Sequence, residues 1–165
     1  MTSKENITNL EKNKLDLPLL NLPNYNFILK NENSNYYIKC IIRNKFVRLT
    51  PEEWIRQNFL MYLITEYNYY KGLISLEEKI KIGNVEKRSD AIVYNKDLSP
   101  FMLIEFKNEK IKLTKDVITQ IGVYNLNVKA PYIVMTNGIN HIIFKINFDT
   151  KEIKLLKEIP KFNKE

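Results

Sequence analysis

Three charged residues lie in the most strand-like part of the sequence. Asp90 precedes the apolar run AIVY, and Glu105 and Lys107 stand at the end of the next apolar run, FMLIEF. If NKDLSP forms the loop between two paired strands, Tyr94 faces Phe101 and Asp90 faces Glu105. Because side chains alternate along a strand, Glu105 and Lys107 share one face. The spacing therefore predicts two carboxylates and one ammonium group at one point of a sheet.

This arrangement is typical of a site for a divalent cation. Two ionised carboxylates facing each other across a strand pair would lie about 5 Å apart and repel each other, and burial increases the cost. Mg²⁺ removes this cost, because it binds hard carboxylate oxygens and fills its other positions with water and substrate phosphate. Lys107 could then orient the attacking water or stabilise negative charge at phosphorus. The alternative is a salt-bridge cluster on a solvent-facing surface, but apolar residues on both faces of these runs favour buried strands.

The rest of the sequence predicts an α/β domain around this pair of strands. The strand-like segments are residues 25–30, 36–42, 45–49, 74–82, 91–94, 101–106, 131–136, 141–148 and 152–156, and the helical segments are residues 51–70 and 114–128. The first two strands flank the turn NENSN and form an N-terminal hairpin. This order predicts a mixed central β-sheet flanked by helices, in one domain at residues 23–158 between a flexible leader, 1–22, and a polar tail, 159–165.

The first predicted helix has a clear start. Thr50 suits the N-cap and Pro51 the first helical position, and Glu53 completes the spacing of a capping box. Ile55 and Phe59 mark its apolar face.

The composition excludes several classes of protein. There is one cysteine, Cys40, and one histidine, His141, so the sequence predicts neither an internal disulfide nor a zinc cluster. No segment matches GxxxxGK[ST], so no motor of the P-loop type is predicted. No window approaches the ~18 apolar residues of a membrane span, and a cytoplasmic location is expected. The formal charge of +7 and the pI near 9.3 favour a polyanionic partner such as nucleic acid.

Around Asp90, Glu105 and Lys107 the sequence resembles the PD-(D/E)XK nuclease superfamily. It resembles more closely the N-terminal nuclease domain of the restriction subunit of type I restriction enzymes. The matching residues are Asp90 in KRSDAIVY, Glu105 and Lys107 in LIEFK, and Gln120 and Tyr124 in QIGVY. The segments TPEEWIRQ and TNGINHIIFKI also look like that domain. The likeness covers most of the chain, as a compact, stand-alone version of the domain.

The resemblance implies a restriction-endonuclease-like fold and a phosphodiesterase centre. Asp90, Glu105 and the backbone carbonyl of Phe106 would hold Mg²⁺, with Mn²⁺ as a substitute, and Lys107 would assist the nucleophilic water. Such centres often add an acidic residue from the first helix. Glu53 is the candidate, although the capping box explains it equally well.

Further residues around the motif would handle the nucleic acid. Gln120 and Tyr124 lie four residues apart on one helix face and would touch the scissile strand or brace the site, unless they are a polar edge residue and core filler. Basic residues would contact the phosphate backbone, unless they only form a solvated lysine surface. They are Lys87, Arg88, Lys110, Lys112 and Lys115.

The sequence thus predicts a Mg²⁺-dependent DNA endonuclease of the restriction or defence type. Two alternatives stay open: a non-cleaving DNA-binding subunit of a larger restriction or repair complex, and an interaction protein without nucleic-acid activity. Because restriction subunits of this family carry a motor that is missing here, a separate translocase or modification subunit is an expected partner. A homodimer would allow paired cuts. The choice between DNA and RNA, the strandedness of the substrate and any target sequence stay open.

Overall fold

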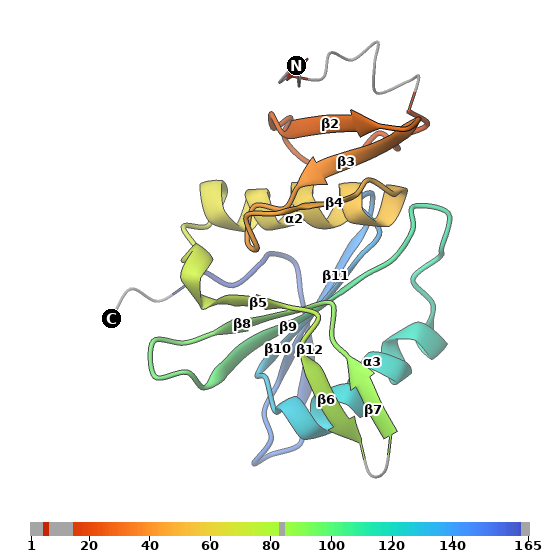
Figure 1. Cartoon of the computed structure of the whole chain (residues 1–165). Coiled ribbons are helices and arrows are strands. Elements are labelled where there is room, and N and C mark those ends of the chain that lie inside the picture. The colour runs from red at the N-terminus through yellow and green to blue at the C-terminus, as the bar shows by residue number, and fades with distance from the viewer. Residues whose placement is uncertain (1–4, 7–14, 83–84, 163–165) are drawn as a thin grey trace.

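The computed structural model describes residues 5–6, 15–82 and 85–162, apart from the side chains of Glu5, Asn6, Ile82, Val85, Lys115 and Val117. A six-stranded sheet in the order β12-β11-β10-β9-β8-β5 lies at its centre. Helix α2 covers one face of this sheet and helix α3 the other (Figure 1). The predicted fold class, a mixed sheet flanked by helices, is confirmed. The elements are β1 (Glu5–Asn6), β2 (Ile28–Glu32), β3 (Asn35–Lys39), β4 (Phe46–Arg48), α2 (Pro51–Glu66), the 3-10 helix η1 (Lys71–Leu73), β5 (Ile74–Leu76), β6 (Lys79–Ile82), β7 (Val85–Arg88), β8 (Ala91–Tyr94), β9 (Pro100–Phe106), α3 (Lys115–Val128), β10 (Tyr132–Thr136), β11 (His141–Ile146) and β12 (Ile153–Leu156).

The central strands β8 and β9 pair in the predicted register over most of their length. Ala91 faces Ile104 and Val93 faces Met102, as the proposed loop requires. The prediction is wrong at the loop itself, where a bulge after Val93 places Tyr94 opposite Pro100 instead of Phe101. The bulge adds one residue to β9 and leaves the pairing near the carboxylates unchanged.

Helix α2 begins as predicted. The Thr50 hydroxyl accepts a hydrogen bond from the Glu53 backbone N–H at 3.1 Å, and Pro51 opens the helix. Its buried face, with Ile55 and Phe59, packs against the β9 residue Ile104 and its sheet neighbours. This packing holds the N-terminus of α2 over the sheet.

Helix α3 packs its Ile121 against Leu103 and Ile133 on the opposite face of the same sheet. Asn125 closes the helix, because its side chain exchanges two hydrogen bonds with the backbone of Ala130, at 2.8 and 3.0 Å. Lys129 follows in the left-handed region with φ 58°.

A second, smaller sheet, in the order β1-β2-β3-β4, contains the predicted N-terminal hairpin. It packs on the face of α2 that points away from the central sheet, where Trp54 contacts Phe27 and Ile38. Helix α2 therefore lies between two sheets (Figure 1). The domain boundaries at residues 22 and 158 stay predictions. The core contains side chains beyond both of them: Leu17, Ile159 and Phe162.

One predicted strand is wrong. The sequence ISLEEKIKI alternates like a single strand, but the chain breaks at Glu77, which has φ 55°. Residues before the break form β5 in the central sheet, whereas residues after it form β6, which pairs with β7 in a separate hairpin. This β6–β7 hairpin projects from the central sheet beside α3 (Figure 1).

Candidate active site

The predicted carboxylates lie where two parallel strands end. Strands β9 and β10 run parallel, and the Lys107 backbone N–H donates to the Thr136 carbonyl at 2.9 Å just beyond them. Asp90 directly precedes β8, beside β9. Carboxyl ends of parallel strands are a common position for ligand sites in α/β proteins.

Asp90 is fixed through both carboxylate oxygens. Its Oδ2 accepts a hydrogen bond from the Phe106 backbone N–H at 2.8 Å, and its Oδ1 accepts one from Arg56 Nη2 at 3.2 Å. The first bond ties Asp90 to the strand that carries Glu105, and the second ties it to helix α2.

Glu105 and Lys107 share a face and form an ion pair, with 2.6 Å between Glu105 Oε1 and Lys107 Nζ. Burial and the negative charge of Asp90 raise the pKa of Glu105, although Lys107 acts in the opposite direction. Burial works to lower the pKa of Lys107, but its bond to Glu105 and the nearby carboxylates raise it overall. Lys107 is therefore a cation at neutral pH, and the ionised form of Glu105 is disfavoured by its surroundings.

Glu53, the acid expected from the first helix, does not contact Asp90 or Glu105 in the described part of the chain. Its two carboxylate oxygens accept hydrogen bonds from Arg56 and Gln57, each at 2.7 Å, and the residue is buried. The expected capping box is also only half formed, because the Glu53 carboxylate serves these two residues. Arg56 links Glu53 to Asp90, because it donates hydrogen bonds to both carboxylates.

Glu52 is the first-helix acid that interacts electrostatically with the centre. Burial and the charge of Asp90 raise the pKa of Glu52 overall, although Arg56 and Lys107 act in the opposite direction. Sequence reasoning missed both Glu52 and Arg56. The signal was present, because Glu52 and Glu53 stand four and three residues before Arg56 on the helix.

Gln120 and Tyr124 share a face of α3, as predicted, with the Gln120 side-chain amide donating to the Tyr124 hydroxyl at 3.0 Å. Lys87 on β7 donates to the same hydroxyl at 2.9 Å and lies 4.9 Å from the Tyr124 ring centroid. Among the described residues, no hydrogen bond joins Gln120 or Tyr124 to the carboxylates. The contacts seen here brace the β6–β7 hairpin against α3.

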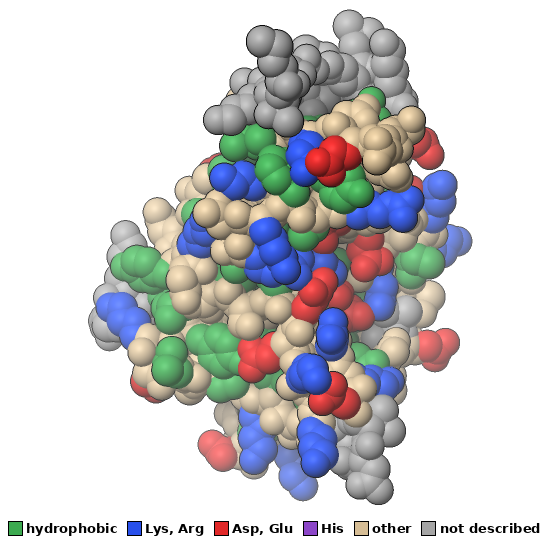
Figure 2. All heavy atoms as spheres, in the orientation of Figure 1, with side chains coloured by type: hydrophobic (Ala, Val, Ile, Leu, Met, Phe, Trp, Pro, Cys, Tyr) green, Lys and Arg blue, Asp and Glu red, His purple; other side chains and the backbone are tan. Residues whose placement is uncertain are grey.

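The other predicted basic residues lie on the surface around the site. Arg88 faces Lys79 across the hairpin, and both are exposed. Lys110 and Lys112 are exposed in the segment between β9 and α3, and the side chain of Lys115 lies outside the described residues. Figure 2 shows red acidic side chains between α2 and the β6–β7 hairpin, with blue basic side chains above and below them.

The donor chemistry of the site fits a hard divalent cation. The salt-bridge cluster around Arg56 and the Glu105–Lys107 pair together contain five carboxylates and three cations, which leaves a formal charge of −2. No group of three His, Cys, Asp or Glu side chains with metal-binding geometry occurs in the described ranges. Asp90 and Glu105 would be the protein ligands, and a contribution from the Phe106 carbonyl stays a prediction.

Comparison with protein families decides the assignment. The family model for the type I restriction enzyme R protein N terminus matches residues 51–160, which include Asp90, Glu105 and Lys107. The chain belongs to this family. The confirmed fold is consistent with the restriction-endonuclease-like fold that the resemblance implied, and the small N-terminal sheet lies outside the matched region. A search among curated proteins found no match.

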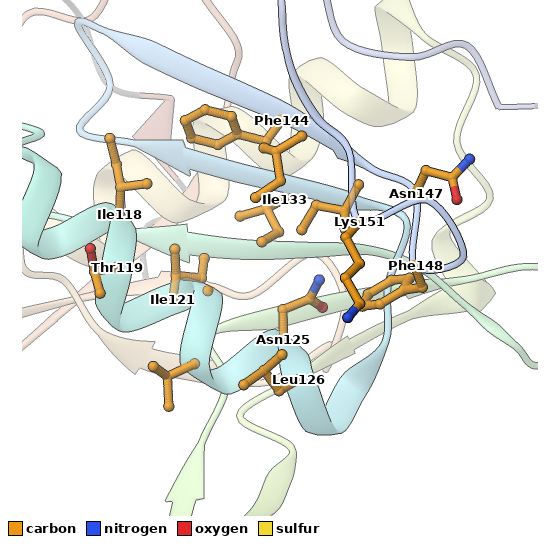
Figure 3. A pocket seen from close by; sticks show the side chains of 14 residues that line it. Ile118, Thr119, Ile121, Asn125, Leu126, Ile133, Phe144, Asn147, Phe148 and Lys151 are labelled. Atoms are coloured by element: carbon orange, nitrogen blue, oxygen red, sulfur yellow. The ribbon is translucent and has the colours of Figure 1, made fainter.

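A hollow elsewhere on the domain has different chemistry from the acidic site. It lies between α3 and the strands β10 to β12, and mainly apolar side chains line it, among them Ile118, Leu126 and Phe144 (Figure 3). Lys151 is the single charged residue among the described residues that line it. No helix in the described part of the chain is long and apolar enough to cross a bilayer.

Proposed function

We propose that this protein is a Mg²⁺-dependent DNA endonuclease of the restriction type. The observation that carries the proposal is the meeting of Asp90, Glu105 and Lys107 at the ends of parallel strands, within a domain of a restriction enzyme family. Two neighbouring carboxylates and a protonated amine are the groups that metal-assisted phosphodiester hydrolysis needs.

Asp90 and Glu105 would hold the ion, with Glu52 nearby and Mn²⁺ as a substitute. When bound, Mg²⁺ supplies Lewis acidity at the phosphate and lowers the pKa of bound water. Lys107 is held on Glu105 and stays protonated, so it acts by donating hydrogen bonds to the attacking water or to a phosphate oxygen. The bonds from Arg56 and the Phe106 N–H keep Asp90 in place during this step.

The basic residues on both sides of the acidic site would bind the phosphate backbone. Exposed Lys79, Lys81 and Arg88 lie on one face of the β6–β7 hairpin, because their positions alternate and pair across the two strands. Lys87 lies on the other face, where it contacts Tyr124. Lysines and arginines in this position give affinity without sequence preference.

DNA is therefore the proposed partner, and the cytoplasm is the proposed location. A separate translocase or modification subunit would supply the motor that family members carry, and a second copy of the chain would permit cuts in both strands.

The test is cleavage of plasmid and single-stranded DNA with Mg²⁺, Mn²⁺ or EDTA. We expect metal-dependent nicking by the wild type and a loss of at least about 100-fold in Asp90→Ala and Lys107→Ala. Lys154→Ala, on the remote strand β12, is the matched lysine control and should keep full activity. Cleavage by the wild type in EDTA would contradict the proposal. Cleavage at the wild-type rate by both site variants would also contradict it.

A non-cleaving DNA-binding subunit is the second candidate. It is favoured by the hydrogen bonds that already occupy both oxygens of Asp90. This candidate predicts salt-sensitive DNA binding by the wild type and both site variants, with no cleavage by any of them.

A further inference from the structure

Arg56 is a buried cation that faces several carboxylates at once. Its side chain is 8% exposed, and its guanidinium nitrogens lie 2.7 Å from Glu53, 3.2 Å from Asp90, 3.5 Å from Glu77 and 3.9 Å from Glu52. A buried arginine with this many acidic neighbours neutralises charge that the fold would otherwise leave unpaired at a high cost.

Contacts other than that with Asp90 also fix the position of Arg56. Glu53 binds its Nη1, Gln57 binds Glu53, and the guanidinium lies 5.6 Å from the ring centroid of Phe106. Only its bond to Asp90 Oδ1 points to a residue expected to bind metal. The arginine is therefore fixed in place and shares one carboxylate oxygen with the proposed metal site.

We propose that Arg56 is the resident counter-ion of this acidic site and that a divalent cation competes with it for Asp90. The inference rests on the proposed function and concerns how strongly that site binds its metal. One positive charge in contact with Asp90 opposes the approach of a doubly charged ion. At the same time, the arginine keeps Asp90 oriented when no ion is bound. Arg56 is thus a positioning residue that limits metal affinity.

This role predicts opposite changes in two measured quantities. In Arg56→Gln the dissociation constant for Mg²⁺ or Mn²⁺ should fall, on the order of tenfold, because the competing charge is gone. DNA cleavage at saturating metal should also fall, by about 10- to 100-fold, because Asp90 loses an orienting partner. If Arg56 only orients Asp90, its loss should instead weaken metal binding.

Two further variants separate charge from packing. Arg56→Lys keeps the positive charge and should bind metal about as weakly as the wild type. Arg43→Gln removes a cation of the same cluster, one that binds Glu77 at 2.7 Å, and should change metal affinity little. Titration of the DNA-free protein with Mn²⁺ and Mg²⁺ can be followed by calorimetry or by the fluorescence of Trp54, the single tryptophan, which is buried beside Glu53.

Tighter metal binding in Arg56→Gln than in the wild type and Arg43→Gln, with Arg56→Lys close to the wild type, would support the inference. Equal or weaker binding in folded Arg56→Gln would overturn it. If Arg56→Gln does not fold, Arg56→Lys decides, and tighter binding by this variant would overturn the inference. If neither the wild type nor the variants bind metal, the inference also fails, and DNA cleavage by the wild type then tests the proposed function by itself.

Discussion

The position of Glu105 in the fold is electrostatically unfavourable for its ionised form. Burial and the charge of Asp90 raise its pKa above the ordinary value of 4.5, so the ionised form is less stable in the folded chain than in the unfolded one. Functional sites often keep such unfavourable groups because the chemistry requires them.

Glu105→Gln should therefore stabilise the protein at neutral pH in the absence of metal. A carboxyl group with a raised folded pKa contributes stability below its unfolded pKa and loses it as the pH rises through the folded pKa. The gain of the variant should be present at pH 7 and vanish below about pH 4. Thermal unfolding at the two pH values measures it, with Glu152→Gln as an exposed control. A variant that is less stable than the wild type at pH 7 would contradict the electrostatic account.

Added Mg²⁺ should stabilise the wild type more than a variant that lacks one of the proposed metal ligands. A ligand that binds only the folded state raises the stability by an amount that grows with its concentration, about 2.7 kcal/mol at 100 times the dissociation constant. We expect MgCl₂ to raise the melting temperature of the wild type and to leave that of Asp90→Asn almost unchanged. Equal amounts of NaCl control for ionic strength.

Part of the site could be predicted from the types and spacing of a few residues. The spacing of Asp90, Glu105 and Lys107 was sufficient to place them together, since strand alternation and hairpin register are short-range rules. Their catalytic roles stay predictions. The contact of Arg56 with Asp90 and the electrostatic interaction of Glu52 with Asp90 could not be predicted from spacing, because they depend on how α2 crosses the sheet.

At the scale of elements, the start of α2 positions the acidic cluster. Thr50 closes the first turn, and Glu52, Glu53 and Arg56 follow within the next two turns. Thr50→Ala should lower the free energy of unfolding by about 1 kcal/mol, because the Glu53 N–H loses its acceptor. Urea unfolding measures this change. Thr150→Ala, in the exposed turn before β12, should have little effect.

The β6–β7 hairpin depends on one hydroxyl group for its contact with α3. Tyr124→Phe removes the acceptor of Lys87 and Gln120, and should cost about 0.5–1.5 kcal/mol. The loss should be local, so amide hydrogen exchange should increase in β6 and β7 more than in β9. Tyr36→Phe, on the exposed surface of β3, is the control. Unchanged exchange in the hairpin would show that the hydroxyl does not brace it.

The break between β5 and β6 shows why this hairpin was missed. Alternating apolar residues predicted one strand through residues 74–82, and the period of two continues across the break. The left-handed conformation of Glu77 redirects the chain, and an ion pair of Glu77 with Arg43 at 2.7 Å accompanies it. A partner so distant in the sequence leaves no local signal.

For the whole molecule, the distribution of charge is more informative than the net value of +7. The site itself is acidic, whereas the hairpin beside it exposes Lys79, Lys81 and Arg88. Under the proposed function, these basic residues would hold the DNA backbone next to the carboxylates, and the divalent cation would lie between the carboxylates and a phosphate.

Lys79→Glu combined with Lys81→Glu should weaken DNA binding and reduce its dependence on salt. Each lost phosphate contact should lower the slope of log K against log[salt] by about 1. Fluorescence anisotropy with a labelled duplex at several NaCl concentrations measures both quantities. Lys151→Glu combined with Lys154→Glu, near the far edge strand, makes the same charge change away from the site. Equal losses in both double variants would indicate only a general effect of net charge.

The composition and the order of the predicted elements were sufficient to predict the fold class. Strands that alternate with helices in this order form a mixed sheet with a helix on each face. The position of the small N-terminal sheet was not predictable in the same way. It depends on Trp54 and its neighbours, which give α2 a second buried face.

The proposed centre is assembled from parts that are far apart in the chain. Glu52 comes from α2, Asp90 precedes β8, Glu105 lies in β9, and the Lys107 backbone N–H donates to the Thr136 carbonyl in β10. A chain still emerging from the ribosome therefore lacks the complete centre until β10 has been synthesised and has paired with β9. Under the proposed function, a copy that ends before β10 would lack the complete centre and would not cleave DNA.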